Sequence, residues 1–331
     1  MTLPSVEQFV GDAVPARCGL ASALLEHAAL RRGLEVRRFN RQIVLVRLGA
    51  AVVPFHGVNG PDTSETAQLM RTHRDTLYTL LTARGVPVPR WSVFTTEQRK
   101  PALSYARGLG WPVTVRPARA SGDDGATADV TGATAFRDAW QASIEATRTG
   151  SSHTTAADAV LVREEIGGRR MQVFVVAGNV AAVTELVGVP PGQTRVFRHG
   201  STTPAHGRLV NLAPPHQTAE DTARDGDAAA VRAVAVAAVQ ALPGMAYGTV
   251  DVIAPEPVRA GAAAGSPVVT YVDCSAVPVA QFPTDGEPCD VAGAILDHYL
   301  DSPRWASARA TPHKTGTAGT ERVEPLYLGR A

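Results

Sequence analysis

The apolar positions of this chain alternate between short β-branched runs and longer stretches with helical spacing. A period of two predicts strands, whereas apolar residues three and four positions apart predict helices. Strands are predicted over 35–39, 42–48, 52–55, 91–94, 113–115, 160–162, 171–176, 180–185, 247–253 and 268–272. Helices are predicted over 18–32, 65–71, 76–83, 136–147, 228–242 and 290–300, with one more between the strands at 91–94 and 113–115. A loosely held start is expected over 1–16, and long loops over 188–209 and 255–267.

A cation beside a glycine-containing loop forms the first candidate site. The β-branched run at 113–115 predicts a strand that delivers Arg116 at its end, and the loop that follows contains Gly122 and Gly125. Such a loop can turn backbone N–H groups toward an anion. This combination favours a phosphate site, and the alternative is an ordinary β-hairpin with a surface arginine.

A pair of acids on two predicted strands forms the second candidate site. Asp251 lies inside the strand at 247–253, and Asp273 follows the strand at 268–272. Mg²⁺ typically binds one or two carboxylates together with substrate phosphates. If the two strands pair with both acids on one face, they predict a metal site. Solvent-facing acids on an ordinary hairpin are the alternative.

Composition narrows the class of protein. The net charge of +1 over 331 residues argues against a general nucleic-acid binder. Cys18, Cys274 and Cys289 show no CxxC spacing, which disfavours a disulfide framework or a thiolate zinc site. No apolar run reaches membrane length, and no basic region with a following apolar core opens the chain. We therefore expect a soluble cytoplasmic protein without nucleic-acid or membrane partners.

The order of motifs resembles the ATP-grasp superfamily. The chain carries, in sequence, GVPVP, LGWPVTVRP, VLVREEIGG, VFVVAGNVAAV, GTVDVI and YVDCSAVP. The runs TSETAQLMRTHRDTLYTLLTARGVPVP and QFPTDGEPCDVAGAILDHYL are most similar to the ATP-grasp domain of cyanophycin synthetases. D-alanine–D-alanine ligases and glutathione synthetases look like more distant relatives. The similarity covers about residues 40–300.

The resemblance implies an α+β fold in which two α+β subdomains grip a nucleotide, preceded by a small N-terminal α/β domain. On this basis we expect the N-terminal domain over 1–70 and the first ATP-grasp subdomain over 71–157. The second subdomain, with the metal-site strands, is expected over 158–302, and a flexible tail over 303–331. Members of the superfamily typically use ATP and Mg²⁺ to convert a carboxylate to an acyl phosphate and pass it to an amine.

The resemblance also implies nucleotide-binding positions. Two lysines that usually bind the nucleotide fall on Arg74 and Arg116. Arginine keeps the positive charge but replaces the compact ammonium group of lysine by a planar guanidinium group. An acid that usually holds the ribose falls on Arg170, which reverses the charge. The loop over the phosphates falls on Ser121, Gly122 and Gly125, and the adenine hinge falls on Arg163, Glu164, Glu165 and Ile166.

The implied metal positions are only partly kept. They fall on Asp251, on Asp273 where glutamate is usual, and on Ser275 where asparagine is usual. An arginine that usually follows the ribose acid falls on Gln172. Because phosphoryl transfer depends on positioning and charge neutralisation, several such changes together bear directly on turnover.

Two further groups of residues have competing interpretations. Arg195 and Arg198 lie in the loop at 188–209, where they could clamp a substrate carboxylate or simply form a solvated basic loop. With Arg116, which would neutralise phosphates, they are the candidate catalytic residues. Cys274 is a conceivable nucleophile, but an adjacent acid disfavours its thiolate.

The leading hypothesis is a diverged ATP- and Mg²⁺-dependent carboxylate–amine ligase that acts on an amino acid or small peptide. The alternative is a catalytically degenerate ATP-grasp protein that senses a nucleotide or binds a partner, because fold alone does not fix function. An α/β binding protein unrelated to ATP-grasp is a third interpretation. A homodimer is common among such relatives, and the sequence offers no surface that argues for or against one.

Overall fold

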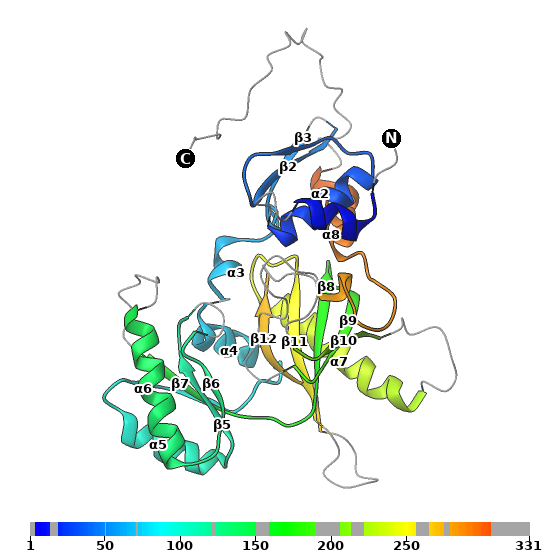
Figure 1. The fold of residues 1–331 in the computed structure, drawn as a ribbon. Coiled ribbons are helices and arrows are strands. Elements are labelled where there is room, and N and C mark those ends of the chain that lie inside the picture. Colours follow the sequence, from blue (N-terminus) through cyan, green and yellow to red (C-terminus); the bar gives the residue numbers. More distant parts are fainter. Residues whose placement is uncertain are drawn as a thin grey trace. The chain divides into compact units, whose positions relative to one another are not determined.

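A computed structural model describes residues 4–13, 19–49, 51–70, 72–120, 124–149, 159–189, 206–212, 222–255, 265–274 and 279–305. The chain divides into two compact units, which are described separately (Figure 1). The first contains residues 1–61 and 292–331, and the second contains residues 62–291. The four-part division expected from the sequence stays a prediction.

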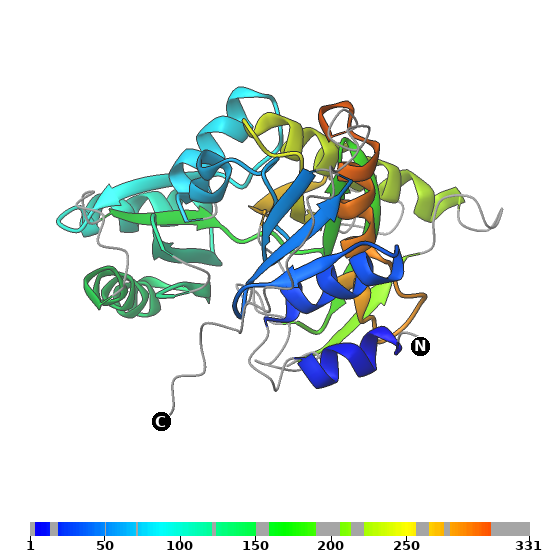
Figure 2. The same ribbon diagram turned by 90° about the horizontal axis from the view of Figure 1, so that it is seen from above.

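The first unit is a three-stranded antiparallel sheet with helices from both ends of the chain. The strands β1 (Val36–Arg38), β2 (Ile43–Leu48) and β3 (Ala51–His56) lie in sequence order. Helices α2 (Leu20–Arg31) and α8 (Val291–Asp301) both belong to this unit (Figures 1 and 2). Arg32, just after α2, holds Asp297 of α8 through two hydrogen bonds of 2.8 Å.

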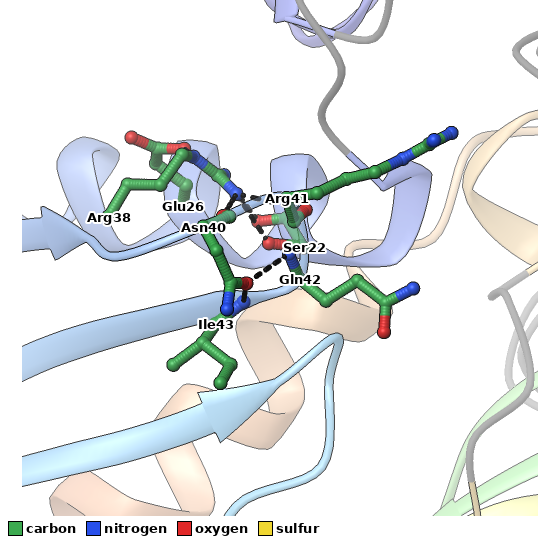
Figure 3. Close-up of polar contacts among 7 residues, drawn as sticks. All are labelled: Ser22, Glu26, Arg38, Asn40, Arg41, Gln42 and Ile43. Carbon is green, nitrogen blue, oxygen red and sulfur yellow. Dashed lines mark hydrogen bonds and ion pairs between the residues drawn. The ribbon is translucent and has the colours of Figure 1, made fainter. Parts of the chain in front are cut away.

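A partly exposed polar network fixes the turn between β1 and β2. The Arg38 guanidinium binds Glu26 and donates to the Ser22 hydroxyl at 2.8 Å, and it also reaches the carbonyls of Asn40 and Arg41 (Figure 3). The Asn40 side chain accepts the next two backbone N–H groups at 2.9 and 2.8 Å. These contacts satisfy the turn internally and have a structural role.

The loosely held start expected over residues 1–16 is wrong for its middle part. Val6–Ala13 forms helix α1, which packs on α2. The ring of Phe9 lies 5.2 Å from that of His27, and Val10 is buried. The short amphipathic pattern of this segment is the sequence signal that predicts such a helix.

The second unit contains a four-stranded sheet in the order β4-β7-β5-β6. The strands are β4 (Trp91–Thr95), β5 (Val113–Pro117), β6 (Thr127–Val130) and β7 (Ala159–Glu164). Helices α5 (Arg99–Leu109) and α6 (Ala133–Thr149) cover one face, where Val113, Val115 and Phe136 share a core. Because strand side chains alternate, Thr114 and Arg116 point to the opposite face.

The second unit also contains a five-stranded antiparallel sheet in the order β10-β9-β8-β11-β12. Its strands are β8 (Arg169–Val176), β9 (Asn179–Val187), β10 (Arg208–Asn211), β11 (Tyr247–Ala254) and β12 (Val268–Asp273). Helix α7 (Thr222–Ala241) covers one face, with Val231 and Ala235 against Val173 and Val250. Helices α3 (Glu65–Met70) and α4 (Arg74–Ala83) contribute Met70 and Leu77 to the same core.

Two strands and a short helix were not expected from the sequence. Strand β6 is only four residues long and largely polar. Strand β10 and the 3₁₀ helix η2 (Val279–Gln281) lie in segments rich in turn-forming residues. The long loop expected over 188–209 is therefore wrong at its end, where β10 begins. In the described part of the chain, no helix combines the length and apolar character needed to cross a membrane.

Candidate nucleotide site

The face of the four-stranded sheet opposite α5 and α6 carries two buried arginines. Thr114 pairs with Arg163 across β5 and β7, and Arg116 pairs with Leu161, so these side chains share one face. Arg116 is 7% exposed and Arg163 is 8% exposed. The alternative of a surface arginine at position 116 is therefore wrong, and Arg116 lies within the strand. Arg163 Nη1 has no hydrogen-bond partner among the described residues.

The two hinge acids point in opposite directions. Glu165 accepts a short hydrogen bond from the Thr114 hydroxyl and lies 3.8 Å from Arg163 Nη2, on the face that carries Arg116. Glu164 instead receives the Arg90 backbone N–H at 2.7 Å and its Nε at 2.6 Å. Glu164 is thus committed to a protein contact, whereas Glu165 borders the arginine face. Ile166, the next hinge residue, is partly buried.

The face of the five-stranded sheet opposite α7 carries a continuous polar row. Cross-strand pairs join Asn211 to Thr184, Thr184 to Gln172, Gln172 to Asp251, and Asp251 to Tyr271. Thr249 pairs with Asp273 one step along the strands, so Asp273 shares this face with Asp251. The expectation that both acids lie on adjacent antiparallel strands and face the same way is confirmed.

The Asp251 carboxylate lies in a low-dielectric position surrounded by charges. Burial raises its pKa above the ordinary value, and the Asp273 carboxylate adds to this effect. A 2.9 Å hydrogen bond from Gln172 Nε2 opposes the shift in pKa, as do the Arg170 and Arg74 guanidinium groups. Gln172 Oε1 and the Thr249 hydroxyl are buried without a hydrogen-bond partner among the described residues.

Arg74 joins the two candidate faces. Its backbone N–H donates to the Ala118 carbonyl at 3.0 Å, just beyond β5, and its guanidinium carbon lies 3.4 Å from the centre of the Tyr271 ring. The residue is 2% exposed, and its Nη1 has no hydrogen-bond partner in the described part of the chain. A buried guanidinium with an unused donor is costly unless an anion satisfies it. The cation–π contact offsets part of that cost.

On this face, Asp251 and Asp273 together could bind a divalent cation. Within the described ranges, no three His, Cys, Asp or Glu side chains gather into one cluster. Two carboxylates on one face are nevertheless the usual protein share of a Mg²⁺ site that also binds substrate phosphates. Asp251 and Asp273 fit that chemistry. Tyr271 donates its hydroxyl to Asp273 at 3.3 Å and so helps to fix this carboxylate.

The other expected site residues have structural contacts or lie outside the described residues, and Arg170, which acts on Asp251, also has a contact of its own. The Arg170 Nη1 group donates to the Val189 carbonyl at 2.8 Å. Gly125 has φ +68°, and an added Cβ would meet Pro117 at 3.1 Å. Backbone conformation and packing therefore explain why a glycine stands at this position. Ser121, Gly122, Arg195, Arg198 and Ser275 lie outside the described residues, and their roles stay predictions.

The comparisons with known proteins bear on the fold. No known protein-family profile matches the chain, and no curated protein sequence matches it significantly. Among solved structures, a bifunctional glutathione synthetase from Pasteurella multocida matches with a TM-score of 0.51 at 17% identity, over 85% of this chain and 44% of its own. The chain has the ATP-grasp fold. The α+β fold class expected from the sequence is thereby confirmed.

Two other structures match less closely. A D-Ala:D-Ser ligase, VanG, from Enterococcus faecalis matches at 19% identity and a TM-score of 0.45, over 70% of this chain and 60% of its own. A D-alanine–D-alanine ligase from Bacillus anthracis matches at 16% identity and a TM-score of 0.43, over 63% of this chain and 57% of its own. The chain spans less than two thirds of each of these structures. The closeness to cyanophycin synthetases stays a prediction.

Three side chains at the site were not predicted from the sequence. Thr114, Thr249 and Tyr271 face the same way as Arg116, Asp251 and Asp273 because each lies two positions away on the same strand. That spacing is the signal that would have found them. The contact of Arg74 with Tyr271 had no such signal, since almost two hundred residues separate them in sequence.

Proposed function

We propose that this protein is an ATP- and Mg²⁺-dependent carboxylate–amine ligase that acts on an amino acid or small peptide. The observation that carries the proposal is the buried Arg74 guanidinium. It has an unused donor, and it acts electrostatically on Asp251. The ATP-grasp fold supports a nucleotide as the anion that meets this cation. The substrate class rests on analogy with proteins of this fold.

The arginines would bind and neutralise the phosphates. Arg74 and Arg116, with Arg163 beside them, are buried guanidinium groups that would form charge-assisted hydrogen bonds to phosphate oxygens. Phosphoryl transfer depends mainly on such positioning and charge neutralisation. A substrate carboxylate oxygen would bond to the γ-phosphorus as the bond to ADP breaks. An amine would then bond to the acyl carbon, and phosphate and a proton would leave.

Asp251 and Asp273 would hold the metal. Bound Mg²⁺ would supply positive charge against the phosphate oxygens. Gln172 would orient Asp251 through the 2.9 Å hydrogen bond, and Tyr271 would orient Asp273. Tyr271 would also fix the Arg74 guanidinium plane, so one residue positions both a cation and an acid.

A specific observation also favours a second function, nucleotide binding without turnover. Arg170 and Arg74 act on Asp251 electrostatically, and Gln172 already occupies one of its oxygens. Protein cations could therefore balance this carboxylate in place of a metal. Such a protein would sense a nucleotide or bind a partner, with the fold kept and the chemistry lost.

Acyl-phosphate trapping separates the two functions. The purified protein would be incubated with MgATP, pooled amino acids and hydroxylamine, and hydroxamate and ADP would be measured against an Asp251→Asn variant. The ligase predicts equal amounts of hydroxamate and ADP that depend on Mg²⁺ and are lost in the variant. Saturable ATP binding without either product would support the second function. Absence of both binding and product would contradict both.

A further inference from the structure

A pocket opens at the edge of the four-stranded sheet, around its outer strand β4. It has a volume of about 630 Å³, within the range of small-molecule sites. Eight residues from the end of α4, the start of β4 and the C-terminal half of α5 line it: Thr82, Val88, Pro89, Arg90, Trp91, Tyr105, Gly108 and Leu109. Tyr105, Gly108 and Leu109 of helix α5 lie on the side of the sheet opposite Arg116, whereas Trp91 pairs with Arg163 and shares its face. The pocket therefore wraps around the outer strand β4, and neither Arg74, Arg116, Arg163 nor Asp251 lines it.

The aromatic walls of the pocket are held in place by neighbours outside it. The Trp91 ring lies 5.6 Å from that of Tyr78, and the Tyr105 ring lies 5.7 Å from that of Phe94. Both aromatic residues are partly exposed, because part of each faces the pocket. Rings fixed in this way lose little conformational freedom when a flat ligand packs on them.

The polar groups of the pocket are donors. Arg90 is anchored by Nε to Glu164 at 2.6 Å and by Nη2 to the Leu109 carbonyl at 3.0 Å. Nη1 is the guanidinium nitrogen that makes no hydrogen bond to the described residues. Burial raises the pKa of the Tyr105 phenol above its ordinary value, so the hydroxyl stays protonated at neutral pH and can donate.

We propose that this pocket binds a flat aromatic carboxylate. Its ring would pack against Trp91 and Tyr105, over Pro89 and Leu109. Its carboxylate would accept from Arg90 Nη1 and the Tyr105 hydroxyl. A single carboxylate suits the site better than a phosphate, because Glu164 already balances most of the Arg90 charge.

Glycine at position 108 provides a way to close the pocket. An added Cβ there meets no atom within 4 Å, and the residue lies in α5 with ordinary helical backbone. Gly108→Leu should therefore fold normally, favour the helix and fill part of the space. Ser104→Leu, at an exposed position of the same helix outside the lining, is the matched control.

The test is calorimetric titration of the full chain with 2-naphthoate and with its neutral amide, with and without MgATP. The proposal predicts that 2-naphthoate binds the wild type saturably and that the amide binds it at least about tenfold more weakly. The acid should bind Gly108→Leu at least about tenfold more weakly than the wild type, and Ser104→Leu as tightly as the wild type. MgATP should not displace the acid. Absence of saturable binding at millimolar 2-naphthoate, equal binding to Gly108→Leu, or displacement by ATP would each overturn the site. Equal affinity for acid and amide would overturn the carboxylate assignment.

Discussion

At the scale of single residues, Arg74 is a buried cation placed for binding. Its side chain is 2% exposed and carries an unused donor, so the folded protein holds a poorly compensated charge. Replacing a whole buried ion pair by apolar residues is often neutral, but removing one charge leaves its partner uncompensated. Because Arg74 also offsets the buried Asp251 charge, we expect Arg74→Met to lower the melting temperature modestly and to weaken ATP binding by at least about tenfold.

The control for that prediction is Arg84→Met, at the exposed C-terminal end of the same helix. It should leave both the melting temperature and ATP affinity close to those of the wild type. A large drop in stability for Arg74→Met, with ATP affinity intact, would assign Arg74 to structure alone.

The buried Asp251 carboxylate should make the stability of the protein depend on pH. Its pKa is raised by burial above the ordinary value of 3.8, so the folded state binds its proton more tightly than the unfolded state. Its contribution to stability is therefore present below the unfolded pKa and is lost as pH rises through the folded pKa. Asp251→Asn should stabilise the ligand-free protein at neutral pH, by a margin that shrinks on acidification.

Thermal unfolding of both proteins across acidic to neutral pH measures this margin. Asn at 251 keeps an oxygen for the hydrogen bond from Gln172, so packing is preserved. A margin that grows on acidification would mean that the protein cations outweigh burial at this carboxylate.

At the scale of elements, Gly168 fixes the turn from the four-stranded to the five-stranded sheet. It lies between β7 and β8 with φ +149°, and an added Cβ would overlap the Ala254 carbonyl and approach Pro255 Cα at 2.8 Å. The neighbouring Gly167 has no atom within 4 Å of an added Cβ. We expect Gly168→Ala to cost about 1–3 kcal/mol in the free energy of unfolding, and Gly167→Ala to be nearly neutral. Denaturant unfolding of both variants checks this, and equal costs would contradict it.

The sequence was informative where an element has a strong period. The β-branched runs of β5, β8 and β11 and the Ala/Val-rich α7 lie where the pattern predicts them. Strand β10 was missed because its pairing with β9, rather than its own four residues, determines it. The row from Asn211 to Tyr271 needs five strands in register, which no local pattern specifies. For the same reason the opposite orientations of Glu164 and Glu165 appeared only in the structure.

At the scale of the whole molecule, the first unit depends on a helix from near the other end of the chain. Tyr299 of α8 is fully buried, and its ring meets that of Phe55 edge-on at 5.1 Å. Tyr299→Ala should destabilise this unit by about 3–5 kcal/mol, because it leaves a large cavity. Amide exchange in β2 and β3 should accelerate, while exchange in β8 and β11 should not.

The matched control is Phe39→Ala, which removes a side chain that is 60% exposed in the same unit and should change exchange little. Equal acceleration in both units after Tyr299→Ala would mean that they unfold together, contrary to the division into two compact units.

The most direct test of the central claim is thermal unfolding with and without MgATP, in the wild type and in Arg74→Met. A ligand that binds only the folded state adds about 2.7 kcal/mol at a hundredfold excess over its dissociation constant. A nucleotide site centred on Arg74 predicts a clear rise in the melting temperature of the wild type and little or none in Arg74→Met. An unchanged wild-type melting temperature at millimolar MgATP, or the same rise in both proteins, would contradict a nucleotide site centred on Arg74.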